Sequence, residues 1–119
     1  MKLKHVTALL IKFAMVGIIL WVVLGITTDL SFGYIMYLSI AVTVLAYVIG
    51  DLLILSATNN VVATIADIVI VFITIYLYNY LLATQVISFW DSLIAAVIIG
   101  VGEWFFHKYI SRKILNNLE

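Results

Sequence analysis

The sequence contains no cysteine and no proline. The lack of cysteine excludes disulfides, thiolate metal ligands, cysteine nucleophiles and cysteine-linked lipid anchors. Proline is ordinarily more frequent in membrane helices than in soluble ones. Its absence predicts unbroken helices, and it argues against transporters that build their sites from discontinuous helices.

Charged residues are also scarce, at 10% of the chain, whereas 66% of the 119 residues are hydrophobic. Soluble domains are about half apolar and about one quarter charged. A soluble fold of this size has too small an interior to bury so much apolar surface. We therefore predict an integral membrane protein in contact with the lipid bilayer. The chain has only six basic residues, nearly all close to its ends, and this argues against nucleic-acid binding.

Four apolar stretches are each long enough to cross a bilayer about 30 Å thick, which takes about 20 helical residues. None shows the alternating pattern of a membrane β-barrel strand. The connections are short, so consecutive helices are expected to pack antiparallel. The predicted fold is an all-α, four-transmembrane-helix antiparallel bundle, a single membrane domain over residues 1–119, with helices at about 5–26, 32–55, 61–83 and 91–109.

Polar residues mark where these helices begin. Ser88 followed three residues later by Asp91 is a capping-box pattern for the fourth helix. Ser31 and Asn60 are the predicted N-caps of the second and third helices, and Asn59 is a predicted turn residue.

Charge and aromatic residues predict the orientation of the chain. Basic residues favour the cytoplasmic side of a membrane, and they lie at both ends of the chain, whereas Asp29 and Asp91 lie in the opposite connections. The predicted topology is N-in and C-in. Aromatic residues are expected to form two interfacial belts, an outer one of Tyr34, Tyr37, Tyr80, Phe89 and Trp90 and an inner one of Trp104, Phe105, Phe106 and Tyr109.

Each predicted span is interrupted by one charged residue. A charge at the centre of a membrane helix costs about 3 kcal/mol on insertion scales. All four lie about 6 to 10 Å from the predicted cytoplasmic end of their helix, at about 1.5 Å per residue, so they are expected to converge in one layer. They are Lys12, Asp51, Asp67 and Glu103.

Helical spacing adds four polar residues to this layer. His107 lies four residues after Glu103, and Tyr47 lies one turn before Asp51. Asn60 and Thr64 share a stripe with Asp67. The expected ion- or proton-binding residues are Lys12, Asp51, Asp67, Glu103 and His107, supported by Tyr47, Thr64 and Asn60.

Two interpretations of this layer follow from its charges. In the structural one, Lys12 pairs with one carboxylate, or extends to the headgroups, and the other acids bond to neighbouring polar groups or water. The protein would then pack its helices through the layer and bind another membrane protein in a structural or regulatory role. In the functional one, three acids against one lysine favour uptake of protons or a small cation from the cytoplasmic side, as part of a transporter or channel. So short a chain would transport as a homo-oligomer.

Enzymatic chemistry has less support. Glu103 and His107, together with Asp51 and Asp67, offer a hard oxygen and nitrogen ligand set, but no HExxH or GxSxG pattern is present. We predict no resident metal, no cofactor and no enzymatic activity, and rank a membrane enzyme acting on lipid headgroups last.

Two segments of the chain are distinctive: residues 50–55 (Gly-Asp-Leu-Leu-Ile-Leu) and 103–107 (Glu-Trp-Phe-Phe-His). Together with shorter matches along nearly the whole chain, they resemble the YndM-like family, small four-span membrane proteins of Bacillus-type bacteria with no established activity. The matching positions include all five candidate binding residues. The resemblance implies a multi-pass protein of the bacterial cytoplasmic membrane.

Overall fold

A computed structural model describes residues 2–81 and 87–110 of the chain, without the side chains of residues 2–4 and 109–110. The described part is helical throughout apart from its short connections, which confirms the all-α prediction. The elements are α1 (Lys2–Thr27), α2 (Phe32–Leu45), η1 (Ala46–Leu55), α3 (Asn60–Leu81) and α4 (Phe89–Ile110).

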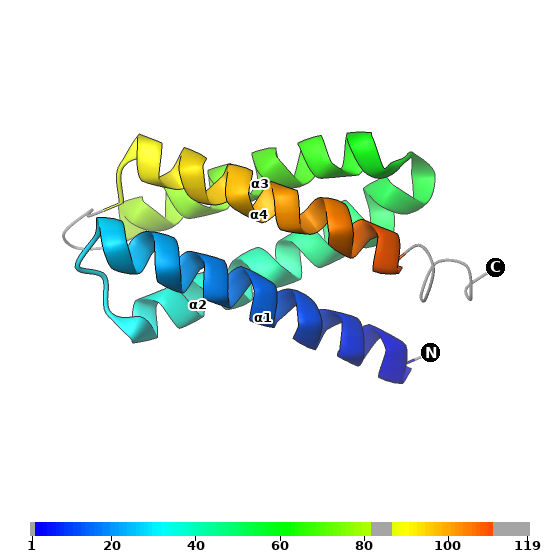
Figure 1. The fold of residues 1–119 in the computed structure, drawn as a ribbon, viewed down its shortest axis with the longest axis horizontal. Helices are drawn as coiled ribbons and strands as arrows, with labels where there is room; N and C mark the ends of the chain where they lie inside the picture. The colour runs from blue at the N-terminus through cyan, green and yellow to red at the C-terminus, as the bar shows by residue number, and fades with distance from the viewer. Residues whose placement is uncertain (1, 82–86, 111–119) are drawn as a thin grey trace.

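The helices form an antiparallel bundle in which α1 begins and α4 ends at the same end (Figure 1). α1 packs against α2 and α4, and α3 packs against α4 and η1. Four segments of the described chain are long and apolar enough to cross a membrane: His5–Thr27, Phe32–Leu55, Asn60–Leu81 and Phe89–Lys108.

The observed helix starts differ slightly from the predicted ones. α3 begins at Asn60 and α4 at Phe89, whereas residues 61 and 91 were predicted. The predicted third-span end at 83, most of the loop before α4, and Arg112 and Lys113 of the predicted basic ends lie outside the described residues. The side chains of Lys2, Lys4 and Tyr109 also fall outside that description.

The three predicted helix caps have different outcomes in the structure. The capping box is confirmed, because the Asp91 backbone N–H donates to Ser88 Oγ at 3.1 Å and the Ser88 N–H donates to an Asp91 carboxylate oxygen at 3.2 Å. Ser31 is the N-cap of α2 but makes no side-chain capping bond. At α3 the prediction was wrong by one residue: Asn59 Oδ1 accepts from the Val62 N–H at 3.0 Å, and Asn60 is free to point inward.

Apolar side chains are divided between the bundle interior and its outer surface. A core of branched side chains, including Val16, Leu20, Ile75 and Ile99, fills the bundle interior. Large apolar side chains also cover the outside of every helix; Leu10 on α1 and Leu77 on α3 are 63% and 57% exposed. Such a continuous apolar exterior needs a lipid environment.

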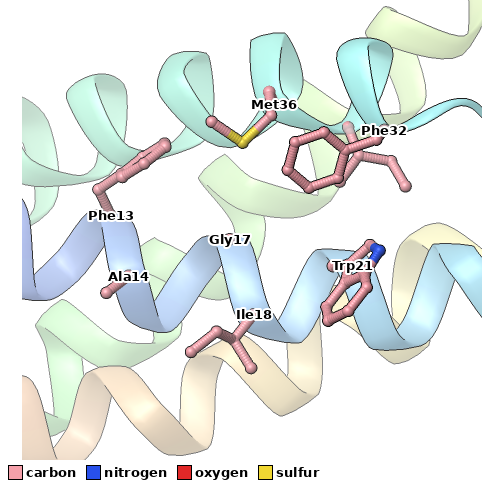
Figure 2. A pocket seen from close by; sticks show the side chains of 8 residues that line it. Phe13, Ala14, Gly17, Ile18, Trp21, Phe32 and Met36 are labelled. Atoms are coloured by element: carbon pink, nitrogen blue, oxygen red, sulfur yellow. The ribbon is translucent and has the colours of Figure 1, made fainter.

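A groove of about 190 Å³ opens on this exterior between α1 and α2. Figure 2 shows Phe13 and Trp21 of α1 facing Phe32 and Met36 of α2 across it. Gly17 lies at its floor, and every lining residue is apolar. The groove therefore belongs to the lipid-facing surface.

Candidate functional site

Five of the sequence-predicted residues meet inside the bundle, and this group is called the charge cluster: Lys12 of α1, Asp51 of η1, Asp67 of α3, and Glu103 and His107 of α4. All five are completely buried, with 0% exposure. The predicted convergence of ionisable residues from all four spans is confirmed.

Lys12 forms one side of the cluster, which we call the lysine pole. Its Nζ donates to Asp51 Oδ2 at 2.8 Å and to Glu103 Oε2 at 2.5 Å. The ammonium group also lies 4.8 Å from the centre of the Phe106 ring, within range of a cation–π contact. Lys12 therefore points into the bundle, and extension of its side chain to the headgroups is excluded by its burial.

His107 forms the other side, the histidine pole, together with the carboxylates of Asp51, Asp67 and Glu103. Its Nε2 lies 2.8 Å from Asp51 Oδ1 and 2.6 Å from Asp67 Oδ2. Glu103 Oε2 is 3.6 Å away, one helical turn earlier on the same helix. Asp51 thus bridges the two poles, with one carboxylate oxygen toward each base.

The other nitrogen of the His107 ring is held by α3. Nδ1 lies 2.8 Å from Asn60 Oδ1 and 3.2 Å from Thr64 Oγ1. The orientation of the Asn60 amide is fixed, because its Nδ2 donates to the Trp104 carbonyl at 3.1 Å. Nδ1 therefore faces an acceptor and carries a hydrogen, which leaves Nε2 directed at the carboxylates.

The carboxylates have more acceptor capacity than the described residues satisfy. Within the described part of the chain, Asp67 Oδ1 and Glu103 Oε1 are buried without a hydrogen-bond partner. Asp51 Oδ1 faces only Nε2 of His107, whose single hydrogen is also directed at Asp67. Three acids thus surround two bases, so even with both bases charged the cluster holds one excess negative charge. A buried net charge is costly, and one further proton or cation would neutralise it.

The backbone around Asp51 departs from α-helical geometry. Residues Ala46–Leu55 form a π-helix, which continues α2 without a break but with a wider turn. Such segments occur frequently at functional sites. At Gly50, α3 approaches so closely that an added Cβ would lie 2.8 Å from Asp67 Cγ. The glycine therefore makes room for the Asp67 carboxyl group. Neither the π-helix nor this contact was predicted from the sequence.

His5 is a neighbour of Tyr47 that was not predicted, and Phe106 is buried although it was predicted to lie in the inner aromatic belt. The Tyr47 hydroxyl bonds to His5 Nδ1 at 2.8 Å, and the two rings meet edge to face. Phe106, predicted for the inner aromatic belt, is only 5% exposed because it packs under Lys12. Its position one residue before His107 places it beside the cluster, but the sequence alone does not distinguish this from an interfacial position.

Four membrane-length apolar helices around a buried group of charges define a multi-pass helical membrane protein. The chain belongs to the family described as "Protein of unknown function (DUF2512)", which matches residues 3–119. It is 30% identical over 116 residues to the "Uncharacterized membrane protein YndM" of Bacillus subtilis (strain 168). The match covers 97% of this chain but 65% of that relative, so the chain spans slightly less than two thirds of its length. No solved structure matches the chain.

Proposed function

We propose that the charge cluster binds one small cation, a proton or a metal ion, and that the protein is a component of a transporter or channel. The observation that supports this proposal is the acid excess: three carboxylates face two bases, and three buried carboxylate oxygens lack a hydrogen-bond partner among the described residues. A purely structural network would be expected to satisfy these oxygens.

The cation would enter from the cytoplasm. Lys12 lies in the first half of α1, and Glu103 and His107 lie in the last half of α4, so the cluster lies toward the end of the bundle where α1 begins and α4 ends. Among the described residues, Lys2 and Lys4 at the start of α1 and Lys108 near the end of α4 lie at this end, and basic residues favour the cytoplasmic side. We accordingly place the protein in the bacterial cytoplasmic membrane with both termini inside.

Binding and release would require a movement of the bundle, because the cluster side chains have no exposed surface. The element best suited to move is η1, since a π-helix can return to α-helical hydrogen bonding and thereby turn Asp51 relative to α3 and α4. In a bundle this small, a second copy of the chain would complete a path across the membrane.

Infrared spectroscopy of the purified, chelator-treated protein tests the acid excess directly. At neutral pH we expect one protonated carboxylic acid per chain. Because the excess is a single charge, Asp67→Asn should remove this signal, although it replaces only one of three acids. Asp29→Asn, which changes an exposed acid in the α1–α2 connection, is the matched control and should retain it. A wild-type spectrum with all acids ionised would contradict the proposal.

Transport is tested separately in proteoliposomes. A flux of protons or metal ions that depends on the protein, is lost in Asp67→Asn and persists in Asp29→Asn would support the transporter or channel role. If the infrared signal is present but no flux occurs with any tested ion, the binding proposal stands and the transport role is wrong.

The alternative is a structural or regulatory protein that binds another membrane protein. One observation favours it: every transmembrane segment contributes to the cluster, so the cluster holds the whole bundle together. In that case the wild-type protein would show neither a protonated acid nor flux, and cluster variants would lose stability alone.

A further inference from the structure

We propose that the cation of the proposed function is a divalent first-row transition-metal ion, bound at the histidine pole. The inference rests on that function, and it adds the class of ion and the ligand set. The ligands would be Nε2 of His107 and one carboxylate oxygen each from Asp51, Asp67 and Glu103.

The ligand atoms are already gathered. One atom from each of the four residues lies within 4.8 Å of the others, on three different elements of the bundle. Around an ion with bonds of about 2.0 to 2.2 Å, tetrahedral ligand atoms are separated by about 3.4 Å. Nε2 is now 2.6 Å from Asp67 Oδ2 and 3.6 Å from Glu103 Oε2. Small side-chain rotations would therefore be sufficient to form the site.

The unpartnered oxygens are a second, independent indication of a ligand. Asp51 Oδ1 is fully buried and lies 2.8 Å from Nε2, but it has no hydrogen-bond partner among the described residues, because the Nε2 hydrogen is directed at Asp67 Oδ2. Asp67 Oδ1 and Glu103 Oε1, the second oxygens of the other two acids, are also buried without a described partner. Buried polar atoms are usually satisfied. A metal ion at the histidine pole would give Asp51 Oδ1 the partner that it lacks.

The His107 ring has the hydrogen-bonding pattern of a metal ligand. Ligating histidines almost always donate their second ring N–H to a carbonyl or carboxylate oxygen, which fixes the tautomer. His107 has this arrangement: Nδ1 faces Asn60 Oδ1, and the Trp104 carbonyl fixes the Asn60 amide. Nε2, the remaining nitrogen, is thereby available to bind an ion among the carboxylates.

Lys12 determines which ionic charge the site accepts. The lysine Nζ lies 2.8 Å from Asp51 Oδ2, which is not the oxygen nearest Nε2. It also lies 2.5 Å from Glu103 Oε2, which faces Nε2 at 3.6 Å as well. Its single positive charge reduces the three carboxylates to a net charge of minus two. A divalent ion with a neutral imidazole then makes the buried cluster neutral.

The metal-free cluster reaches neutrality differently. It does so with a charged His107, a charged Lys12 and one protonated acid. Loading the metal releases the proton of the imidazolium and the proton of that acid, because ligands must be deprotonated to bind. The balanced exchange is therefore one divalent ion for two protons.

The donor types select the ion within the divalent class. Imidazole suits zinc, iron and related metals, carboxylates suit manganese and other hard ions, and soft ions require sulfur ligands. One imidazole with three carboxylates accordingly favours Mn²⁺, Fe²⁺ or Zn²⁺ over Ca²⁺, Mg²⁺ or Cu⁺.

Mn²⁺ is the probe for the test, because its binding to the purified full chain can be followed by electron paramagnetic resonance. We expect one saturable site per chain, with pulsed spectra showing a nitrogen coupled to the metal. Calorimetry in buffers of different ionisation enthalpy should give two protons released per ion. The apparent dissociation constant should then fall about 100-fold per unit rise in pH at neutral pH. Ca²⁺ in excess should not displace the probe.

Variants assign the ligands. Asp67→Asn and His107→Asn should abolish saturable binding, and Asn60→Ala should weaken it about 10- to 100-fold because it removes only the partner of Nδ1. Asp29→Asn and His5→Asn are matched controls outside the ligand set and should bind as wild type. Should the ligand variants fail to fold, the nitrogen coupling and the proton count of the wild-type protein decide the question.

The possible failures are distinguishable. If Mn²⁺ and Zn²⁺ show no saturable binding but the infrared spectrum contains a protonated acid, the metal proposal is overturned and the proposed function stands with a proton as the ion. If metal binds without nitrogen coupling, or equally well to Asp67→Asn, the site assignment is wrong. If neither metal binding nor a protonated acid is found, both proposals fail.

Discussion

Replacing Lys12 by methionine removes a buried positive charge and keeps an unbranched side chain of similar length. The change leaves Asp51 Oδ2 and Glu103 Oε2, now 2.8 and 2.5 Å from Nζ, without their donor. Removing one partner of a buried ion pair costs about 3 to 5 kcal/mol of stability, because the other charge remains buried without compensation. We expect Lys12→Met to lower the free energy of unfolding by that amount. The decrease will be smaller if one of the carboxylates takes up an additional proton, because protonation removes part of the unbalanced charge.

A second substitution in the same pair makes this prediction specific. Adding Glu103→Gln to Lys12→Met restores the original excess of one negative charge, because one base and one acid have been removed together. The double variant should therefore be more stable than the sum of the single changes predicts. The coupling between contacting charged residues should be about 2 kcal/mol, within the usual range of about 0.5 to 3 kcal/mol.

The measurement is reversible unfolding of the four proteins in detergent micelles, followed by helical circular dichroism. Lys108→Met is the matched control, since Lys108 is exposed on the last turn of α4 near Trp104 and Phe105, and its loss should leave stability unchanged. A Lys12→Met protein as stable as the Lys108→Met protein, or single effects that simply add, would refute the charge balance on which both proposals depend.

Two further predictions concern packing. Gly50→Ala should destabilise the bundle and weaken cation binding, because the new methyl group would displace the Asp67 carboxyl. Gly25→Ala, where an added Cβ meets nothing within 4 Å, is its control and should be neutral or stabilising in thermal unfolding. Asn79→Ala should cost about 1 to 3 kcal/mol, because the largely buried Asn79 Oδ1 accepts from the Ile87 N–H at 2.8 Å and holds the chain before α4. Equal stability of both glycine variants, or an Asn79→Ala protein that unfolds like wild type, would show that these contacts are unimportant.

The spans and the convergence of charges could be predicted because each depends on a local property. An apolar run of about 20 residues is sufficient to identify a membrane helix, and the observed helices begin within three residues of their predicted starts. The cost of a charge in the membrane forces Lys12 and the three acids to face one another. Each of the four charged residues lies at a similar distance from the predicted cytoplasmic end of its helix, and this indicated that they share one depth in the membrane.

The partners within the cluster could not be predicted in the same way. Spacing along one helix shows that Asp67 and Asn60 share a face, but not that both would contact His107 on α4. The pairing of Lys12 with Asp51 and Glu103 depends on the rotation of three helices about their axes. The π-helix has no proline or other sequence signal, and it depends on the tertiary fit around residue 50.

The separation of the charged partners along the chain has a consequence for synthesis. Lys12 leaves the ribosome 39 residues before Asp51 and 91 residues before Glu103. The first helix therefore enters the membrane with an uncompensated ammonium group, at a cost of about 3 kcal/mol on insertion scales. Its partner on η1 arrives with the next hairpin arm, so co-translational insertion of the two as one unit is expected. Asp67 then enters with α3 before its partner His107, so the nascent chain holds an unpaired buried acid until α4 is inserted.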